Sequence, residues 1–179
     1  MSEDEIRLAW KEQPMLRPRI EKVVVNMGIG KSGEPLEKAV KVLKEITGHT
    51  PCRRKAKTSI RDFGIRAGES IACIVTLREE EALDFLKKVL TVVDNKISGR
   101  SFDKQGNFSF GLKEHIELPG VKYDPDVGIF GMDVCVSVIR SGYRVKTRRK
   151  GRSKLGAKHV LTPEESMAFA KETLGVEIV

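Results

Sequence analysis

Positive charge is concentrated in two segments of this chain, and the chemistry it offers is phosphate binding. Residues 140–158 (RSGYRVKTRRKGRSKLGAK) contain no Asp or Glu and nine basic residues, namely Arg140, Arg144, Lys146, Arg148, Arg149, Lys150, Arg152, Lys154 and Lys158. Residues 53–66 set one acid, Asp62, against Arg53, Arg54, Lys55, Lys57, Arg61 and Arg66. Like charges at this density repel one another unless a polyanion neutralises them. Because the two segments hold 15 of the 33 Lys and Arg residues, the sequence predicts a nucleic-acid partner.

A second group with possible chemistry is Gly28-Ile-Gly30-Lys31-Ser32, which looks like the end of a phosphate-binding loop. The complete motif needs a further glycine five residues before the Gly of Gly-Lys-Ser, and Val25 occupies that position. A small nucleotide-binding enzyme is therefore kept only as a rival interpretation. We expect the glycines to let the end of a strand approach a partner's backbone closely.

Catalytic and metal-binding patterns are weak. Glu114-His115 and Asp124-x-Asp126 are acid-rich candidates without a legible partner, and a solvated surface or turn explains both. The histidines are scattered and no CxxC pair occurs, so neither a zinc site nor any cofactor is predicted, and the chain is not expected to be an enzyme. The cysteines lie in or beside strand-like runs, where buried thiols are expected: Cys52, Cys73 and Cys135.

Composition is that of a basic globular protein. The 179 residues, 40% of them hydrophobic, suffice for a single domain over 1–179, and the net charge is +8. No apolar run approaches the roughly 18 residues of a membrane span, and the acidic N-terminus does not resemble a secretory signal. A reducing cytoplasm, without membrane association, fits the cysteine pattern.

The hydrophobic pattern alternates between strand and helix. Runs rich in β-branched residues, or alternating in polarity, predict strands at 21–29, 50–57, 70–77, 107–112 and 134–139. Apolar residues at the helical period predict helices at 35–47, 79–93 and 162–174, the last opening with a Thr162–Glu165 capping box. This order predicts an α+β domain, a mainly antiparallel sheet with helices packed on one face. Residues 1–19 form an N-terminal helix or arm, 58–69 an extended Gly-containing loop, and 140–160 a basic loop.

The sequence indicates a nucleic-acid partner more directly than it indicates which kind of nucleic acid is bound. Aromatic residues make up 6% of the chain, and Phe102, Phe108 and Phe110 do not match the aromatic signature of RNA recognition modules, so we expect these rings in the core. Docking on the shape and backbone of a folded RNA is therefore favoured over base stacking. A general DNA- or RNA-compacting protein is the remaining alternative.

Several segments, taken in order, resemble large-subunit ribosomal protein family number five in its archaeal and eukaryotic form, the eukaryotic protein eleven. The resemblance covers the chain from about residue 13 to the end. The matching segments are VVVNMGIG (23–30), ITGHTP (46–51), KAKTSIRDFGIRAG (55–68), VTLR (75–78), NFSFGLKEHI (107–116), KYDPDVGIFG (122–131) and GAKH (156–159).

The resemblance implies a structural protein of the cytoplasmic ribosome that attaches 5S rRNA in the central protuberance of the large subunit. The contacts it implies with 5S rRNA involve Asn26, Gly28, Gly30, Lys31, His49, Arg53, Arg54, Lys55, Thr76 and Arg78, with His49 standing where the family commonly has Gln. The extended loop would touch P-site tRNA through Lys57, Ser59, Arg61, Phe63, Gly64 and Arg66.

The basic stretch is expected to meet large-subunit rRNA and to form a bridge with small-subunit protein thirteen. The residues assigned to this role are Arg144, Lys146, Arg148, Arg149, Lys150, Arg152, Lys154, Lys158 and His159. Neighbouring 5S-associated large-subunit proteins complete the set of partners that the resemblance implies.

Overall fold

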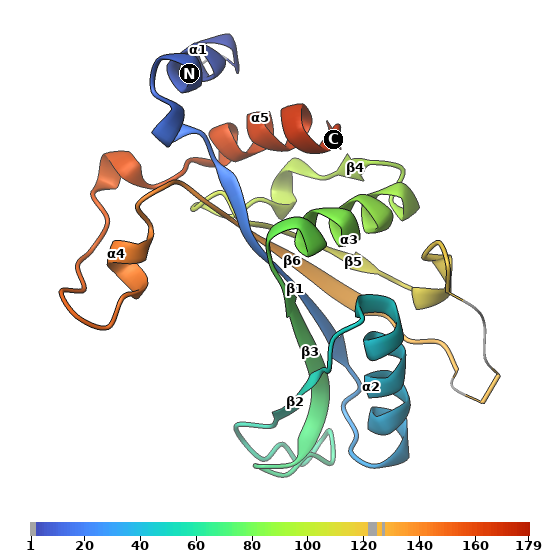
Figure 1. Ribbon diagram of the computed structural model, residues 1–179. Coiled ribbons are helices and arrows are strands. Elements are labelled where there is room, and N and C mark those ends of the chain that lie inside the picture. Colours follow the sequence, from blue (N-terminus) through green and yellow to red (C-terminus); the bar gives the residue numbers. More distant parts are fainter. Residues whose placement is uncertain (1–2, 122–124, 127) are drawn as a thin grey trace. The chain divides into compact units, whose positions relative to one another are not determined.

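The computed structural model describes residues 3–121, 125–126 and 128–179. Its helices are α1 (Glu3–Glu12), α2 (Glu34–Thr47), α3 (Glu79–Val92), α4 (Arg144–Thr147) and α5 (Pro163–Leu174) (Figure 1). Its strands are β1 (Arg19–Gly28), β2 (Cys52–Lys55), β3 (Ser70–Leu77), β4 (Lys96–Ile97), β5 (Phe108–Leu112), β6 (Met132–Ile139) and β7 (Glu177–Ile178). Four 3-10 turns begin at Pro14, Gly99, His115 and Ala157.

Five strands form one antiparallel sheet in the order β2-β3-β1-β6-β5, and β4 pairs in parallel with β7. The predicted α+β class is confirmed. Within the predicted turn and acidic pair at 124–126, Asp124 lies outside the described residues, as do Lys122, Tyr123 and Val127.

The chain divides into two compact units. Unit 1 comprises residues 1–23, 78–109 and 135–179, and unit 2 comprises residues 24–77 and 110–134. Strands β1, β5 and β6 each contribute residues to both units. The prediction of one domain over 1–179 stays a prediction.

Unit 2 has one buried sheet face and one that is not buried. Val25 and Met27 of β1 are fully buried, as are alternate residues of β3 from Cys73 to Leu77. Helix α2 contacts β3 (Figure 1) and itself buries Leu36, Ala39, Val42 and Leu43. Because side chains alternate across a strand, the intervening residues of β1 and β3 point to the opposite face, which we call the open face.

Unit 1 contains the first and the last of these helices, α1 and α5. Helix α1 packs against α5 with Ile6 and Trp10 buried, so residues 3–12 of the predicted N-terminal helix or arm form a helix. A Lys171–Glu3 ion pair joins the same two helices at 2.5 Å. Helix α5 begins with the predicted capping box, in which the Thr162 N–H donates to Glu165 Oε2 at 3.0 Å.

The prediction of three buried cysteines is wrong for two of them. Cys73 is buried, and burial raises the pKa of its thiol to about 11, whereas Cys52 and Cys135 are exposed. Both exposed residues do lie in strands, but at solvent-facing positions, which an apolar run alone does not identify. Phe108 is buried in the core, as expected, and its ring centroid lies 5.1 Å from that of Phe102. No helix in the described part of the chain is long and apolar enough to cross a membrane.

Gly106 is the glycine most tightly enclosed in unit 1. A Cβ at this position would lie 3.0 Å from Ser166 Cβ and 3.2 Å from Leu161 Cβ, and φ is +76°. We therefore expect Gly106→Ala to lower the free energy of unfolding by about 2–5 kcal/mol, because overpacking adds to the cost of a left-handed backbone. Gly175→Ala is the matched control: φ is +66° but no atom lies within 4 Å, so only about 1–2 kcal/mol should be lost. Equal losses in urea denaturation would contradict the packing argument.

Candidate RNA-binding surface

The pairing of β2 with β3 places Arg54 on the open face. Arg54 opposes Ala72, which alternates with the buried Cys73 of β3. Directly opposed residues of antiparallel strands point to the same face. The pairing then shifts by one residue, because Lys55 opposes Ser70 and Ile71 is the extra residue on β3. Both Arg54 and Lys55 are exposed.

Polar side chains stand beside these cations. Thr76 is exposed near the end of β3, and Asn26 is half-buried on β1 between the buried Val25 and Met27. Asn26 Nδ2 donates to Asp133 Oδ2 at 3.4 Å, which orients the amide and leaves its carbonyl oxygen and a second N–H available. The open face of unit 2 thus offers amide, hydroxyl and cationic groups together.

Arg53 occupies the opposite face from its neighbour Arg54. It opposes the buried Cys73, and its Nη2 donates to Glu37 Oε2 of α2 at 2.8 Å. Both partners of this ion pair are about half exposed. Of the three basic residues predicted on this strand, Arg54 therefore shares the face with Asn26 and Thr76, while Arg53 does not.

The glycine turn after β1 is closed by its own backbone. The N–H groups of Ile29 and Gly30 both donate to Ile71 O at 3.0 Å, and Gly30 has φ +74°. A phosphate-binding loop needs such N–H groups free to point at its ligand. This geometry argues against a nucleotide site at Gly28–Ser32. Gly28 and Lys31 remain exposed at the edge of unit 2.

The segment 58–68, expected as an extended loop, folds into a small hairpin. Ile60 and Ile65 exchange both backbone hydrogen bonds, at 2.9 and 3.1 Å, and Gly64 has φ +66° in the turn between them. Phe63 at the tip is 72% exposed, and Lys57, Arg61 and Arg66 are exposed as well. The Ser59 hydroxyl accepts from the Ala67 N–H at 2.9 Å, so this side chain supports the hairpin.

Glu69 anchors the base of this hairpin to the glycine turn. The Ser32 hydroxyl donates to one carboxylate oxygen, and the Arg66 N–H donates to the other at 3.1 Å. These two donors, the hydroxyl first, hold the pKa of Glu69 below its ordinary value of 4.5. Neither Glu69 nor Asp133 was identified from the sequence as part of the site. Asp133 could have been found from its outward position in the alternating strand, whereas nothing local indicates the role of Glu69.

Two residues predicted to contact 5S rRNA are not part of the open-face strands. His49 is exposed directly after the Gly48 cap of α2 in unit 2, and its N–H donates to Thr47 Oγ1 at 3.4 Å. Arg78 is exposed at the start of α3 and belongs to unit 1.

The basic stretch of unit 1 is not uniformly available to a partner. Arg140 is only 5% exposed and forms an ion pair with Glu165 of α5, while its Nη1 donates to Lys158 O at 3.3 Å. Counting Arg140 with the phosphate-binding cations is therefore wrong. His159 Nε2 bonds Ser141 O at 2.8 Å, which ties this half-buried ring to the protein.

The remaining cations of the stretch reach solvent. Lys146 is half-buried, and the others are exposed: Arg144, Arg148, Arg149, Lys150, Arg152, Lys154 and Lys158. Short local bonds shape this loop, since Arg148 Nε donates to Gly151 O at 2.7 Å and Ser153 N donates to Val145 O at 3.1 Å.

The acid-rich pair Glu114-His115 has a structural explanation. His115 is buried, and its ring Nδ1 accepts from the Phe130 N–H at 3.2 Å. The backbone N–H of His115 donates to Phe130 O at 3.0 Å. The ring and the backbone of His115 therefore both hold two segments of unit 2 together. Within the described ranges no three His, Cys, Asp or Glu side chains are grouped as metal ligands.

Comparisons with known proteins identify the family of this chain. Residues 13–66 match the model of the family described as ribosomal protein L5, and residues 70–169 match the model for the C-terminus of the same ribosomal family. Relatives named large ribosomal subunit protein uL5 occur in Pyrobaculum aerophilum (54% identical, covering 95% of this chain and 98% of the relative) and Aeropyrum pernix (52%, covering 98% and 92%). A third, from Archaeoglobus fulgidus, is 51% identical and covers 94% of this chain and 93% of its own. The chain therefore belongs to the ribosomal protein L5 family, a structural and non-enzymatic component of the large ribosomal subunit.

Proposed function

We propose that this protein binds 5S rRNA on the open face of unit 2 and attaches it in the central protuberance of the large subunit. The observation that carries the proposal is the pairing of Arg54 with Ala72, which sets an exposed cation on the same face as Asn26 and Thr76. Cations that meet phosphates supply affinity, while amide and hydroxyl groups position the RNA by hydrogen bonds. Helix α2 covers the other face, so a folded RNA has one broad surface to dock on.

The test is a titration of the purified protein against 5S rRNA at salt concentrations from about 50 to 200 mM. With about eight phosphate contacts, affinity should fall with log[salt] at a slope of about −6 to −7. An unrelated duplex RNA and a DNA duplex of equal length serve as controls, and both should bind more weakly. A flat salt dependence, or equal binding to all three, would overturn the proposal, and the last result would favour a general compacting protein.

The exposed hairpin carries the second element of the proposal, a contact with P-site tRNA. Its tip presents the aromatic ring of Phe63 next to Arg61, while Glu69 and Ser59 brace its base. Aromatic rings beside cations suit stacking on unpaired bases.

Deleting residues 60–66 should leave 5S rRNA binding unchanged, because the open-face strands lie outside the deletion. Ribosomes carrying the deletion should retain P-site tRNA about tenfold less well, since one base–aromatic stack is worth about 1–3 kcal/mol. Phe63→Ala is the milder matched variant and should show most of the loss. Impaired 5S binding by the deletion would show that the hairpin's role is assigned wrongly.

The basic stretch of unit 1 is proposed to contact large-subunit rRNA and to form a bridge with small-subunit protein thirteen. Seven cations between Arg144 and Lys158 are exposed, which is more than a single phosphate group can engage. Their number therefore supports a polyanionic partner. Neighbouring 5S-associated proteins of the large subunit are the remaining proposed partners.

A further inference from the structure

A pocket of about 440 Å³ lies in unit 1, partly within the basic stretch, and the contacts proposed above assign no ligand to its interior. Its apolar lining comes from the end of β6 and from the segment before α5: Val138, Ile139, Leu155, Val160 and Leu161. The volume falls within the range of small-molecule sites, about 300–1,000 Å³. Among the described residues that line it there is no Asp or Glu. The pocket therefore suits a ligand that is partly apolar and negatively charged.

Arg140 supplies a polar group that lacks a partner. It lines the pocket, is 5% exposed, and commits Nη2 to Glu165 and Nη1 to Lys158 O. Its Nε–H is the one buried side-chain polar group in the described part of the chain without a hydrogen-bond partner. Buried donors are normally satisfied, so the Arg140 side of the pocket wall carries one unmet donor.

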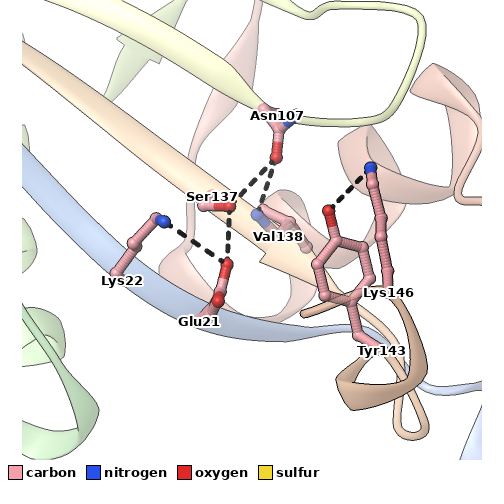
Figure 2. A network of polar contacts seen from close by, with 7 residues as sticks. All are labelled: Glu21, Lys22, Asn107, Ser137, Val138, Tyr143 and Lys146. Atoms are coloured by element: carbon pink, nitrogen blue, oxygen red, sulfur yellow. Dashed lines mark hydrogen bonds and ion pairs between the residues drawn. The ribbon is translucent and has the colours of Figure 1, made fainter. Parts of the chain in front are cut away.

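Tyr143 is the aromatic residue of the pocket, and its position is fixed. Lys146 Nζ donates to the Tyr143 hydroxyl at 3.1 Å and lies 5.2 Å from the centre of its ring (Figure 2). The Asn107 carbonyl oxygen accepts from the Val138 N–H at 3.2 Å and from the Ser137 hydroxyl at 3.4 Å, which fixes this part of the wall (Figure 2). Gln105, in contrast, is exposed at the pocket with an amide whose donor and acceptor match the edge of a base.

Cations surround this aromatic and apolar interior. Lys146, Arg152 and Lys154 line the same pocket. A second hollow in the same stretch is lined by Arg144, Arg148, Arg149 and Lys150, together with Gly142 and Val145. One nucleotide would engage only the first group of cations, whereas a polynucleotide would engage both.

We propose that this pocket receives one unstacked nucleotide of an RNA, with its base against Tyr143 and its flanking phosphates on Lys146, Arg152 and Lys154. The inference rests on the proposed function, because it takes RNA as the partner. It adds a site that reads an extruded base, which is the usual way proteins distinguish irregular RNA from a plain helix.

The test uses RNA hairpins that carry one unpaired A, C, G or U in the stem, and a fully paired hairpin as reference. The full-length protein should bind at least one bulged hairpin about tenfold more tightly than the paired one, the effect of a single stacked base. With 2-aminopurine at the bulge, binding should change its fluorescence. Equal affinity for all bulged and paired hairpins would overturn the inference.

Leu155→Trp is the decisive variant, because it fills the pocket and keeps every cation. It should abolish the preference for the bulge while leaving affinity for the paired hairpin and its salt slope unchanged. Arg149→Ala, outside the pocket, is the matched control and should weaken both hairpins equally. A preserved preference in Leu155→Trp, with the variant folded by circular dichroism, would contradict the proposed site.

Two further measurements distinguish a site for RNA from a site for free nucleotides, and the inference from the proposed function. Free adenosine monophosphate offers the same base and phosphate, and at about 1 mM it should not displace the bulged hairpin, since it lacks contacts with the second group of cations. Displacement would show a free-nucleotide site and overturn the inference. Selective binding of 5S rRNA, measured alongside, tests the proposed function independently: its loss would sink that function, whereas an unselective pocket with 5S binding intact would sink only the inference.

Discussion

Replacing Arg54 with alanine should lower affinity for 5S rRNA by about 10- to 100-fold, since a charge-assisted hydrogen bond contributes about 1.5–3 kcal/mol. Arg54 lies on the open face through its pairing with Ala72 and makes no described contact with an acidic group. Its guanidinium can approach a phosphate without first breaking an ion pair. The measurement is an equilibrium titration at fixed salt, because the contribution of a phosphate contact depends on ionic strength.

Arg53→Ala is the control that differs by one position and shares the same residue type. Arg53 opposes Cys73 on the side covered by α2 and donates to Glu37. Its removal should change the affinity by less than about threefold, as expected for a cation away from the RNA. Equal losses in the two variants would show that strand alternation does not separate the RNA-facing cations from the others.

Removing the carboxylate of Glu165 should produce the largest loss of stability. Glu165→Ala leaves the 5%-exposed guanidinium of Arg140 without its ion-pair partner, and breaking a buried pair costs about 3–5 kcal/mol. Glu165→Gln should cost less, about 1–3 kcal/mol, because its single carbonyl oxygen can still accept from Arg140, while the bond from the Thr162 N–H to Oε2 is lost. Urea denaturation of both variants gives the free energies of unfolding.

Glu37→Ala provides the exposed counterpart of this experiment. The Arg53–Glu37 pair has a good distance of 2.8 Å, but both side chains are about half exposed, so at most about 1 kcal/mol should be lost. If Glu165→Ala cost no more than Glu37→Ala, the buried pair would not hold the basic stretch to α5 as described.

Long periodic segments made most of the fold predictable. The predicted strand at 70–77 coincides with β3, and the Thr162–Glu165 capping box begins α5 as expected. Both depend on residues close in sequence. The β4–β7 pair was missed because two-residue strands are too short to show a period.

Parts of the site depend on long-range pairing and could not be read from composition. Arg140 looks like any other cation of the stretch until Glu165, 25 positions later, neutralises it. The pairing that sets Arg54 opposite Ala72 and Arg53 opposite Cys73 likewise depends on β3. Low aromatic content predicts little base stacking, and the base site that we propose uses a single tyrosine in an apolar pocket among cations. Asn26 and Thr76, by contrast, follow from simple strand alternation.

The native thiol of Cys52 reports on the open face without any substitution there, and the thiol of Cys73 is the internal control. Cys52 opposes Ile74 on the open face and is exposed, whereas Cys73 is buried with the pKa of its thiol raised to about 11. Modification of Cys52 by a small maleimide, followed by mass spectrometry of its peptide, measures access to this surface. Cys73 should stay unmodified throughout as long as the protein remains folded.

At a 5S rRNA concentration about ten times the Kd, modification of Cys52 should slow about tenfold, because only the unbound fraction reacts. An unrelated duplex RNA at the same concentration should leave the rate close to that of the free protein. If saturating 5S rRNA leaves Cys52 fully reactive, the RNA does not lie on the open face of unit 2, and the central claim is contradicted.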